Sequence, residues 1–223
     1  EVTLSAYWID KYEVTVDEYK KCVDAAACFE PYNCVDDEPH LGDIMCSWGV
    51  PGRELHPVHH LGVEDAKDYC AWAGKRLPTE AEWEKAARGT DGRKYPWGIA
   101  PASCEYAVMM EVDGAPGCGE GHTMPVGSKP AGASPYGVMD MAGNVWEFVH
   151  DWYREDYYAI SPGIDPTGPA SGAVRVIRGG GFNYNELPLR TSDRDRGNYY
   201  DTRDVNLGFR CVKEAPAVEG GEP

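Results

Sequence analysis

Three segments of the chain place apolar residues at helical spacing, and two of them open with a capping sequence. Thr15 is followed three residues later by Glu18, and Thr79 by Glu82. In such a pair each side chain can satisfy the other residue's free backbone amide, which marks the start of a helix. We therefore predict helices that begin at Thr15, run from about Val63 to Ala73, and run from Thr79 to Arg88.

Strands are predicted where β-branched and aromatic residues concentrate. These segments are residues 7–14, 145–149, 174–178 and 206–212. Between them, Gly 26 and Pro 17 interrupt the chain every few positions, which is typical of a loop-rich fold. We expect an α+β fold with little regular secondary structure, one domain over residues 1–213, and a disordered acidic tail or linker over residues 214–223.

The charge balance narrows the classes of partner. The formal net charge is -16 and the isoelectric point is about 4.7. Nucleic-acid phosphates require a basic surface, so the composition argues against nucleic acid as a partner. The sequence also lacks an apolar run of 18 residues, so we expect no membrane span.

The eight cysteines are Cys22, Cys28, Cys34, Cys46, Cys70, Cys104, Cys118 and Cys211. The set contains no Cys-x-x-Cys pair, which disfavours a zinc ribbon or a thioredoxin-type site. An even number in a loop-rich acidic chain favours disulfides, and hence an extracytoplasmic location at the periplasm, the cell surface or outside the cell. The alternative is eight reduced and buried thiols. Spacing alone does not give the connectivity.

Three histidines, His56, His59 and His60, cluster around Pro57. Adjacent residues of an extended segment point to opposite faces, so His59 and His60 cannot both face one ion. We therefore expect surface or strand histidines here rather than a metal site.

Residues 136–148 combine two carboxylates with a turn-prone centre. Asp140 and Glu147 bracket Ala142-Gly143-Asn144, where the backbone can curl and direct its carbonyl groups inward. Carboxylate and carbonyl oxygens are the ligands that calcium prefers. On these residues alone, the alternative is a tight turn whose Asp and Glu bind local amides.

Five blocks together resemble the formylglycine-generating enzyme, or sulfatase-modifying factor, family. They are Tyr7-Trp8-Ile9-Asp10-Lys11-Tyr12-Glu13-Val14-Thr15, Trp72-Ala73-Gly74-Lys75-Arg76-Leu77-Pro78-Thr79-Glu80-Ala81-Glu82-Trp83-Glu84, Asp140-Met141-Ala142-Gly143-Asn144-Val145-Trp146-Glu147, Arg178-Gly179-Gly180-Gly181-Phe182 and Asn206-Leu207-Gly208-Phe209-Arg210-Cys211. The blocks occur in the family's order and span most of residues 5–213. The resemblance implies a fold related to the C-type lectins, with little regular structure.

The resemblance also bears on activity. The enzymes of this family bind copper(I) with two cysteines that lie between the Arg-Gly-Gly strand and the final Gly-Phe-Arg-Cys. This chain has no cysteine between Cys118 and Cys211, and Ser192 or Asp193 cannot replace a soft thiolate. We therefore expect no catalytic residue and a binding or structural module of the cell envelope or exterior.

Two alternatives share the family or the fold. The first is an oxidoreductase, related to the formylglycine-generating enzyme or similar to the sulfoxide synthases, which carry histidine-ligated iron on a helical domain. The second is a hypervariable ligand-binding protein, which would need a C-terminal stretch dominated by Asn. Residues 190–203 are instead a mixture of Arg, Asp and Tyr.

The family's pattern also implies a ligand set and disulfides. Relatives bind calcium with residues spaced like Asp140, Gly143, Val145 and Glu147, so calcium is the expected structural cofactor. Relatives bridge a helix to the C-terminal strand, which implies a Cys70 to Cys211 disulfide. We pair Cys104 with Cys118 and leave Cys22, Cys28, Cys34 and Cys46 to pair among themselves.

The expected ligand surface lies in the same C-terminal region. Its candidate residues are Arg190, Arg194, Arg196, Tyr199 and Tyr200. Arginine and tyrosine are enriched at protein interfaces, so we expect a protein partner in an envelope or extracellular assembly. The alternative is that these arginines form surface salt bridges with the neighbouring aspartates and bind no partner.

Overall fold

The computed structural model describes residues 2–32, 46–197 and 206–216. Its three α-helices are α1 (Val16–Asp24), α2 (Val63–Trp72) and α3 (Glu80–Arg88), and it has short 3₁₀ helices η1 (Pro116–Gly119), η2 (Pro130–Gly132) and η3 (Tyr157–Ala159). Its strands are β1 (Tyr7–Ile9), β2 (Trp146–Trp152), β3 (Arg175–Arg178), β4 (Asp195–Arg196), β5 (Leu207–Gly208) and β6 (Val212–Glu214). Every helix in these ranges is too short or too polar to cross a membrane.

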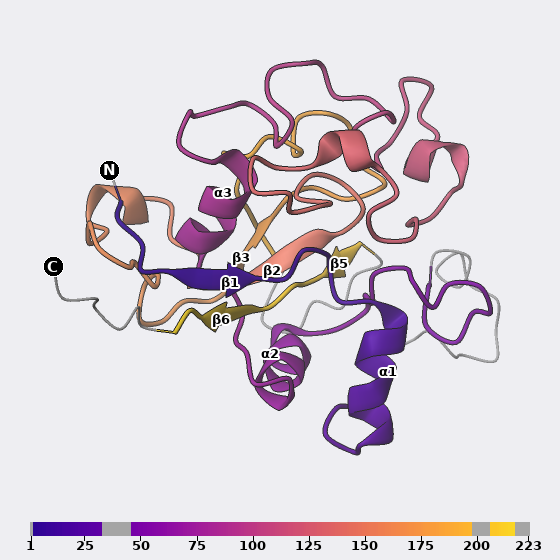
Figure 1. Ribbon diagram of the computed structural model, residues 1–223, viewed down its shortest axis with the longest axis horizontal. Coiled ribbons are helices and arrows are strands. Elements are labelled where there is room, and N and C mark those ends of the chain that lie inside the picture. Colours follow the sequence, from indigo (N-terminus) through magenta and orange to yellow (C-terminus); the bar gives the residue numbers. More distant parts are fainter. Residues whose placement is uncertain (1, 33–45, 198–205, 217–223) are drawn as a thin grey trace, which may run out of the picture.

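The strands form two small sheets. One has four strands in the order β4-β3-β2-β5, and the other pairs β1 with β6. Figure 1 shows α1 and α2 on one side of the sheets and α3 on the other. Long loops connect these elements, as the Gly and Pro content predicts. The α+β class with little regular structure is confirmed.

Both predicted capping boxes are present. The Thr15 hydroxyl accepts a hydrogen bond from the Glu18 amide at 3.2 Å, and the Glu18 carboxylate accepts one from the Thr15 amide at 3.0 Å. The corresponding distances at Thr79 and Glu82 are 3.2 Å and 2.8 Å. Each pair satisfies amides that the first helical turn leaves free, which fixes where α1 and α3 begin.

The C-terminal segment is divided where a single strand over residues 206–212 was predicted. β5 runs parallel to β2, whereas β6 runs antiparallel to β1. The residues between them, Phe209 to Cys211, carry the chain from one sheet to the other. The predicted strand over residues 7–14 is also shorter, because β1 ends at Ile9 and Val14 bonds instead to Phe209 and Val58.

Two main clusters make up the core. The larger joins α1 and α2 to the sheets through Tyr19, Tyr69 and Phe209, whose rings contact one another. The other places Trp83 of α3 against Val149 and Val176. The helices therefore bury the apolar stripes that the spacing predicts.

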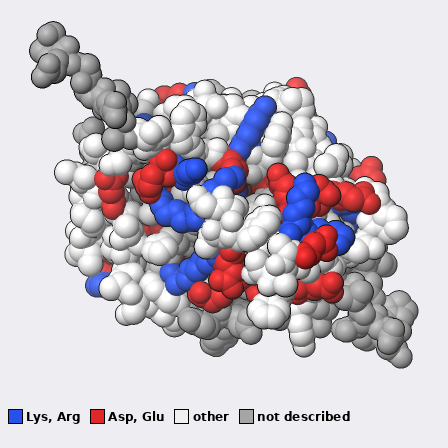
Figure 2. Space-filling model, turned by 60° about the horizontal axis from the view of Figure 1, so that its bottom comes forward, with Lys and Arg blue, Asp and Glu red and all other residues white. Residues whose placement is uncertain are grey.

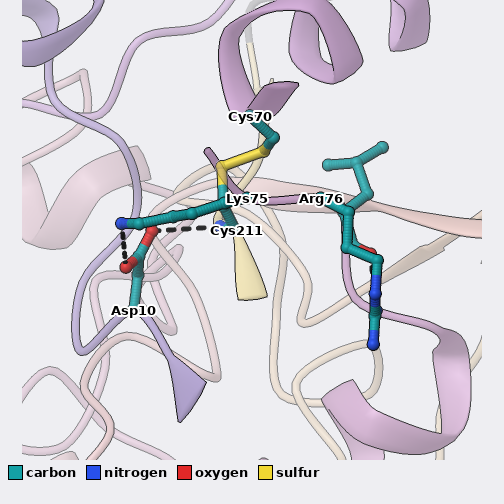
Figure 3. The surroundings of a disulfide bond; sticks show 6 residues. Asp10, Cys70, Lys75, Arg76 and Cys211 are labelled. Carbon is teal, nitrogen blue, oxygen red and sulfur yellow. Dashed lines mark hydrogen bonds and ion pairs between the residues drawn. A yellow bond between two sulfur atoms is a disulfide. The ribbon is translucent and has the colours of Figure 1, made fainter. Parts of the chain in front are cut away.

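Three disulfides join described cysteines. Cys70 bonds to Cys211 and Cys104 to Cys118, the two pairs that were predicted, and Cys22 bonds to Cys28. Cys46 is also disulfide-bonded, and Cys34 lies outside the described residues. Figure 3 shows the Cys70–Cys211 bond beside Asp10, whose carboxylate accepts hydrogen bonds from Lys75 at 2.5 Å and from the Cys211 amide at 3.3 Å.

Charges of both signs cover the surface despite the excess of acid. Figure 2 shows Lys and Arg side chains beside Asp and Glu on the face that it presents. On α1, Lys20 pairs with Asp24 at 2.6 Å and Lys21 with Asp17 at 2.8 Å. Such exposed pairs contribute little stability each but keep the surface mixed in sign.

Candidate functional site

The four predicted calcium residues lie at the start of β2 and in the turn before it, and all four are buried. The turn needs left-handed backbone at Asp140 (φ 56), Gly143 (φ 83) and Asn144 (φ 62). A Cβ on Gly143 would lie 2.4 Å from the Val108 carbonyl oxygen, so glycine is required here for space as well as for conformation. The curled turn predicted from Ala142-Gly143-Asn144 is present.

Glu147 is paired with a guanidinium. Its two carboxylate oxygens each accept a hydrogen bond from Arg210 at 2.7 Å, and Oε2 also accepts one from the indole of Trp83 at 2.9 Å. Arg210 donates three further bonds, to the carbonyls of Met139, Asp10 and Lys11. Both side chains of the pair are 0% exposed, and every donor of the guanidinium has an acceptor.

Glu13 completes this cluster. Its carboxylate accepts hydrogen bonds from the Val145 amide at 3.1 Å and from the Asn144 side chain at 2.7 Å. Glu13 lies near the end of the strand predicted over residues 7–14, and nothing in its sequence neighbours predicts a buried carboxylate. We call Glu13, Asp140, Glu147 and Arg210 the carboxylate centre.

The carboxylate centre holds three acids and one base. Burial, followed by the charges of Asp140 and Glu147, raises the pKa of Glu13 well above its ordinary value. Burial also raises the pKa of Asp140, although the hydrogen bond that it accepts from the Gly127 amide at 2.6 Å opposes this rise. The centre thus has three carboxyl groups for one guanidinium, and burial favours the neutral, protonated forms of Glu13 and Asp140.

The donors of this centre are chemically suited to calcium, with one restriction. They are carboxyl oxygens beside a curled backbone, and a hard cation would favour the ionised forms of these groups. However, both oxygens of Glu147 already accept bonds from Arg210, so a metal would have to share them. Within the part of the chain that the structure describes, no three His, Cys, Asp or Glu side chains are grouped to hold a metal. Backbone carbonyls would have to supply part of the ligand set.

The histidines are not surface or strand residues as predicted. His56, His59 and His60 are all buried. His60 has φ 64, and this left-handed conformation breaks the alternation of an extended strand, so that the rings of His59 and His60 meet. Their Nδ1 atoms lie 2.8 Å apart and share a hydrogen bond.

Two hydroxyl groups extend this contact. His59 Nε2 lies 3.1 Å from Ser47 Oγ, Ser47 Oγ lies 3.1 Å from Thr123 Oγ1, and Thr123 Oγ1 lies 3.0 Å from His56 Nδ1. We call these three histidines and two hydroxyl residues the histidine network. Burial lowers the pKa of His56 to about 4 and that of His59 well below its ordinary value, so these two rings are uncharged near neutral pH.

The arginines of the expected ligand surface have partners in the fold. Arg194 binds both oxygens of Glu80, each at 2.9 Å, and its side chain is only 13% exposed. Arg190 pairs with Asp193 at 2.9 Å, and Arg196 lies over the ring of Tyr153. Tyr199 and Tyr200 lie outside the described residues. Arg194 thus supports the fold, whereas Arg190 and Arg196 keep exposed side chains.

The stretch that would hold the copper-binding cysteines is packed with other side chains. Leu189 is 0% exposed and lies with Tyr95, Met109 and Ala142 in a third core cluster. Thr191 is also 0% exposed, and its hydroxyl donates to the Arg93 carbonyl at 2.7 Å. None of the described cysteines is free.

Comparison with known proteins agrees with this architecture, a disulfide-bonded α+β fold built mainly from loops. The sulfatase-modifying factor enzyme 1-like domain matches residues 1–215, and the chain belongs to this family. It is similar to the formylglycine-generating enzyme of Streptomyces coelicolor, with 43% identity over 77% of this chain and 57% of that protein. It is also similar to hercynine oxygenase of Mycolicibacterium smegmatis, with 38% identity over 66% of this chain and 34% of that protein.

A solved structure shares the fold. PvdO from Pseudomonas aeruginosa superposes with a TM-score of 0.74 and 24% identity, covering 96% of this chain and 83% of that one. The chain spans only 57% of the Streptomyces enzyme and 34% of the oxygenase. The fold and family predicted from the five sequence blocks are therefore confirmed.

Proposed function

We propose that this protein is a non-catalytic member of the family that acts as a binding or structural module of the cell envelope or exterior. The observation that carries the proposal is the composition of residues 183–194, which contain no cysteine. Leu189 and Thr191 pack there as ordinary core residues. Without a thiolate pair, this segment has no soft ligand for copper(I).

The alternative function is an oxidoreductase. The similarity to hercynine oxygenase supports it, since that relative is an oxygenase by name. Metal analysis of the purified protein separates the two functions. Stoichiometric iron or copper would favour the oxidoreductase, whereas its absence after purification under anaerobic, chelator-free conditions would favour the binding module.

A protein partner is the second part of the proposal. Exposed Arg190 and Arg196 shortly precede Tyr199 and Tyr200 in the sequence. Arginine and aromatic side chains at such surfaces often carry most of the binding energy. We expect a double substitution of Tyr199 and Tyr200 by Ala to weaken capture of a protein partner from the native source without changing the melting temperature.

The matched control is a substitution of the exposed Lys20 and Lys21 on α1, far from these tyrosines in sequence. This variant should retain the same captured protein, identified by mass spectrometry. Full capture by the tyrosine variant, or loss of its fold, would refute the proposed surface.

An extracytoplasmic location is proposed from the disulfides. Three of them join described cysteines, and disulfides persist in oxidising compartments. Peptide mapping of protein from its native source, with free thiols blocked during lysis, tests this. Recovery of Cys70 as a free thiol would remove the main support for such a location.

Calcium is proposed as the structural cofactor of the carboxylate centre. The excess of buried carboxylates over guanidinium groups supports it, because a divalent cation would neutralise them. The response of the melting temperature to chelation tests this part of the proposal.

A further inference from the structure

A cavity of about 530 Å³ lies between the N-terminal segment, α3 and the loop around η3. The N-terminal segment runs beside that loop in Figure 1, and Thr3 pairs there with Ile164. The apolar part of the lining comes from Val2, Leu4, Ala81, Tyr157, Tyr158 and Pro166. A partly apolar cavity of this volume suits a small molecule.

Most of the charged side chains that line the cavity are already paired. Glu80 binds Arg194 at 2.9 Å, and Glu84 binds Arg88 at 2.6 Å and Arg178 at 2.7 Å. These side chains therefore already have ion-pair partners within the fold.

Asp151 and Lys85 are the exceptions. Asp151 is 2% exposed, and its Oδ2 accepts a hydrogen bond from the Glu80 amide at 2.8 Å. Its other oxygen receives no hydrogen bond from any described residue, and neither Asp151 nor Lys85 has an ion-pair partner among them. The cavity wall thus holds one acid and one base whose charges are not matched within the described chain.

We infer that this cavity binds a small zwitterion, an amino acid with an apolar side chain, whose ammonium group pairs with Asp151 and whose carboxylate pairs with Lys85. Both residues line this one cavity, so a small molecule bound in it can contact both. Asp151 bonds to the first residue of α3, and Lys85 lies five positions further along the helix, about 7.5 Å along its axis. The long lysine side chain can shorten this separation.

The ionisation of Asp151 gives the site a pH dependence. Burial raises the pKa of Asp151 to about 7; the nearby charges of Glu80 and Glu82 add to this rise, and Arg194 and the Glu80 amide oppose it. An ammonium group binds the ionised form, so binding releases a proton. Affinity should therefore rise as the pH increases through about 7.

Isothermal titration calorimetry with three matched compounds tests the site. L-leucine carries both charges, 3-methylbutylamine lacks the carboxylate, and 4-methylpentanoate lacks the ammonium group. At about pH 8, where Asp151 is ionised, leucine should bind most tightly, the amine more weakly, and the acid least.

Two variants assign the charges. D151N should weaken leucine binding by about tenfold or more and abolish its pH dependence. The amide oxygen of Asn can still accept from the Glu80 amide, so the melting temperature should change little. K85M should bind leucine and the amine equally, while K67M, on α2, should behave as the parent protein.

The inference fails if 4-methylpentanoate binds as well as leucine, if none of the three compounds binds at millimolar concentration, or if D151N binds leucine like the parent. Should D151N unfold, the pH dependence of amine binding by the parent decides the matter, because it must weaken below about pH 7. This site is separate from the carboxylate centre, so its failure leaves the proposed function untouched.

Discussion

Two buried polar groups stabilise different parts of this protein. One contains a buried ion pair, and the other is a hydrogen-bonded network of histidines and hydroxyl groups. The carboxylate centre holds Glu147 and Arg210 as ions at 0% exposure and has two further acids beside them. The histidine network is also buried, but burial lowers the pKa of His56 and His59, and its rings bond to one another and to hydroxyl groups. The first group depends on charge pairing, and the second depends on hydrogen-bond geometry.

The difference predicts which perturbations each group tolerates. Removing one partner of a buried ion pair leaves a full charge without compensation, whereas removing one hydroxyl from a neutral network leaves only dipoles unsatisfied. The carboxylate centre should therefore be the more sensitive to substitution and the only one of the two that responds to cations.

The largest effect should follow from R210M. Methionine fills part of the space but leaves Glu147 buried without its guanidinium, and the free energy of unfolding should fall by about 3–5 kcal/mol. Urea denaturation measures the loss. R190M removes an exposed pair with Asp193 and should cost less than about 1 kcal/mol. Equal losses in the two variants would contradict the importance of the buried pair.

Chelation should have the next largest effect. If calcium occupies the carboxylate centre, saturation at about one hundred times its dissociation constant stabilises the fold by about 2.7 kcal/mol. EDTA should then lower the melting temperature, and calcium should restore it where magnesium does not, because magnesium requires a smaller octahedral cage.

The variant D140N gives the matched test of calcium binding. It keeps an acceptor for the Gly127 amide but removes one negative charge, so its melting temperature should respond less to calcium. E147A is less informative, since it also leaves Arg210 unpaired. A parent protein that melts at one temperature with and without chelator would show that the segment is a turn only.

A smaller effect is expected from S47A in the histidine network. The variant removes the hydroxyl that joins His59 to Thr123, so both lose a buried hydrogen bond. The expected loss is about 1–3 kcal/mol in urea denaturation, and calcium should not alter it. A loss as large as that of R210M would mean that the neutral network is as sensitive as the ion pair.

The stability of the two groups should also depend on pH with opposite signs. His56 has a lowered pKa, so between about 6.5 and 4 the unfolded chain binds more protons, and stability falls as the pH falls. Glu13 has a raised pKa, so its contribution is complete below about 4.5 and is lost as the pH rises through its folded value.

Measuring the free energy of unfolding of H56N and E13Q from acid to alkaline pH tests whether the two pH dependences have opposite signs. H56N should lose less stability than the parent as the pH falls. E13Q should lose less stability than the parent as the pH rises. Profiles that shift in the same direction would show that one of the two groups does not titrate as its surroundings imply.

Local signals in the sequence predicted the helices well. The capping boxes at Thr15 and Thr79 act over three residues, so their chemistry is visible in the sequence itself. The turn-prone residues Ala142-Gly143-Asn144 predicted the turn before β2, and the family resemblance implied the Cys70–Cys211 disulfide. Both features involve residues in or next to the sequence blocks that resemble the family.

The polar interior could not be predicted in the same way. Glu147 and Arg210 are 63 residues apart, and Glu13 lies further still from both. They become buried together because residues 209–211 carry the chain from one sheet to the other. No local sequence pattern predicts this contact. The histidines were placed wrongly because a single left-handed residue, His60, reverses the alternation that an extended segment would have.

The Cys70–Cys211 disulfide has a consequence for proteolysis. The bond closes a covalent ring that spans 141 residues. A single cut in any loop within that ring cannot release a fragment, because the two pieces stay joined through sulfur. A nicked molecule should therefore migrate as one species on a non-reducing gel and separate into two only after reduction, so the protein can survive loop cleavage with its halves still held together.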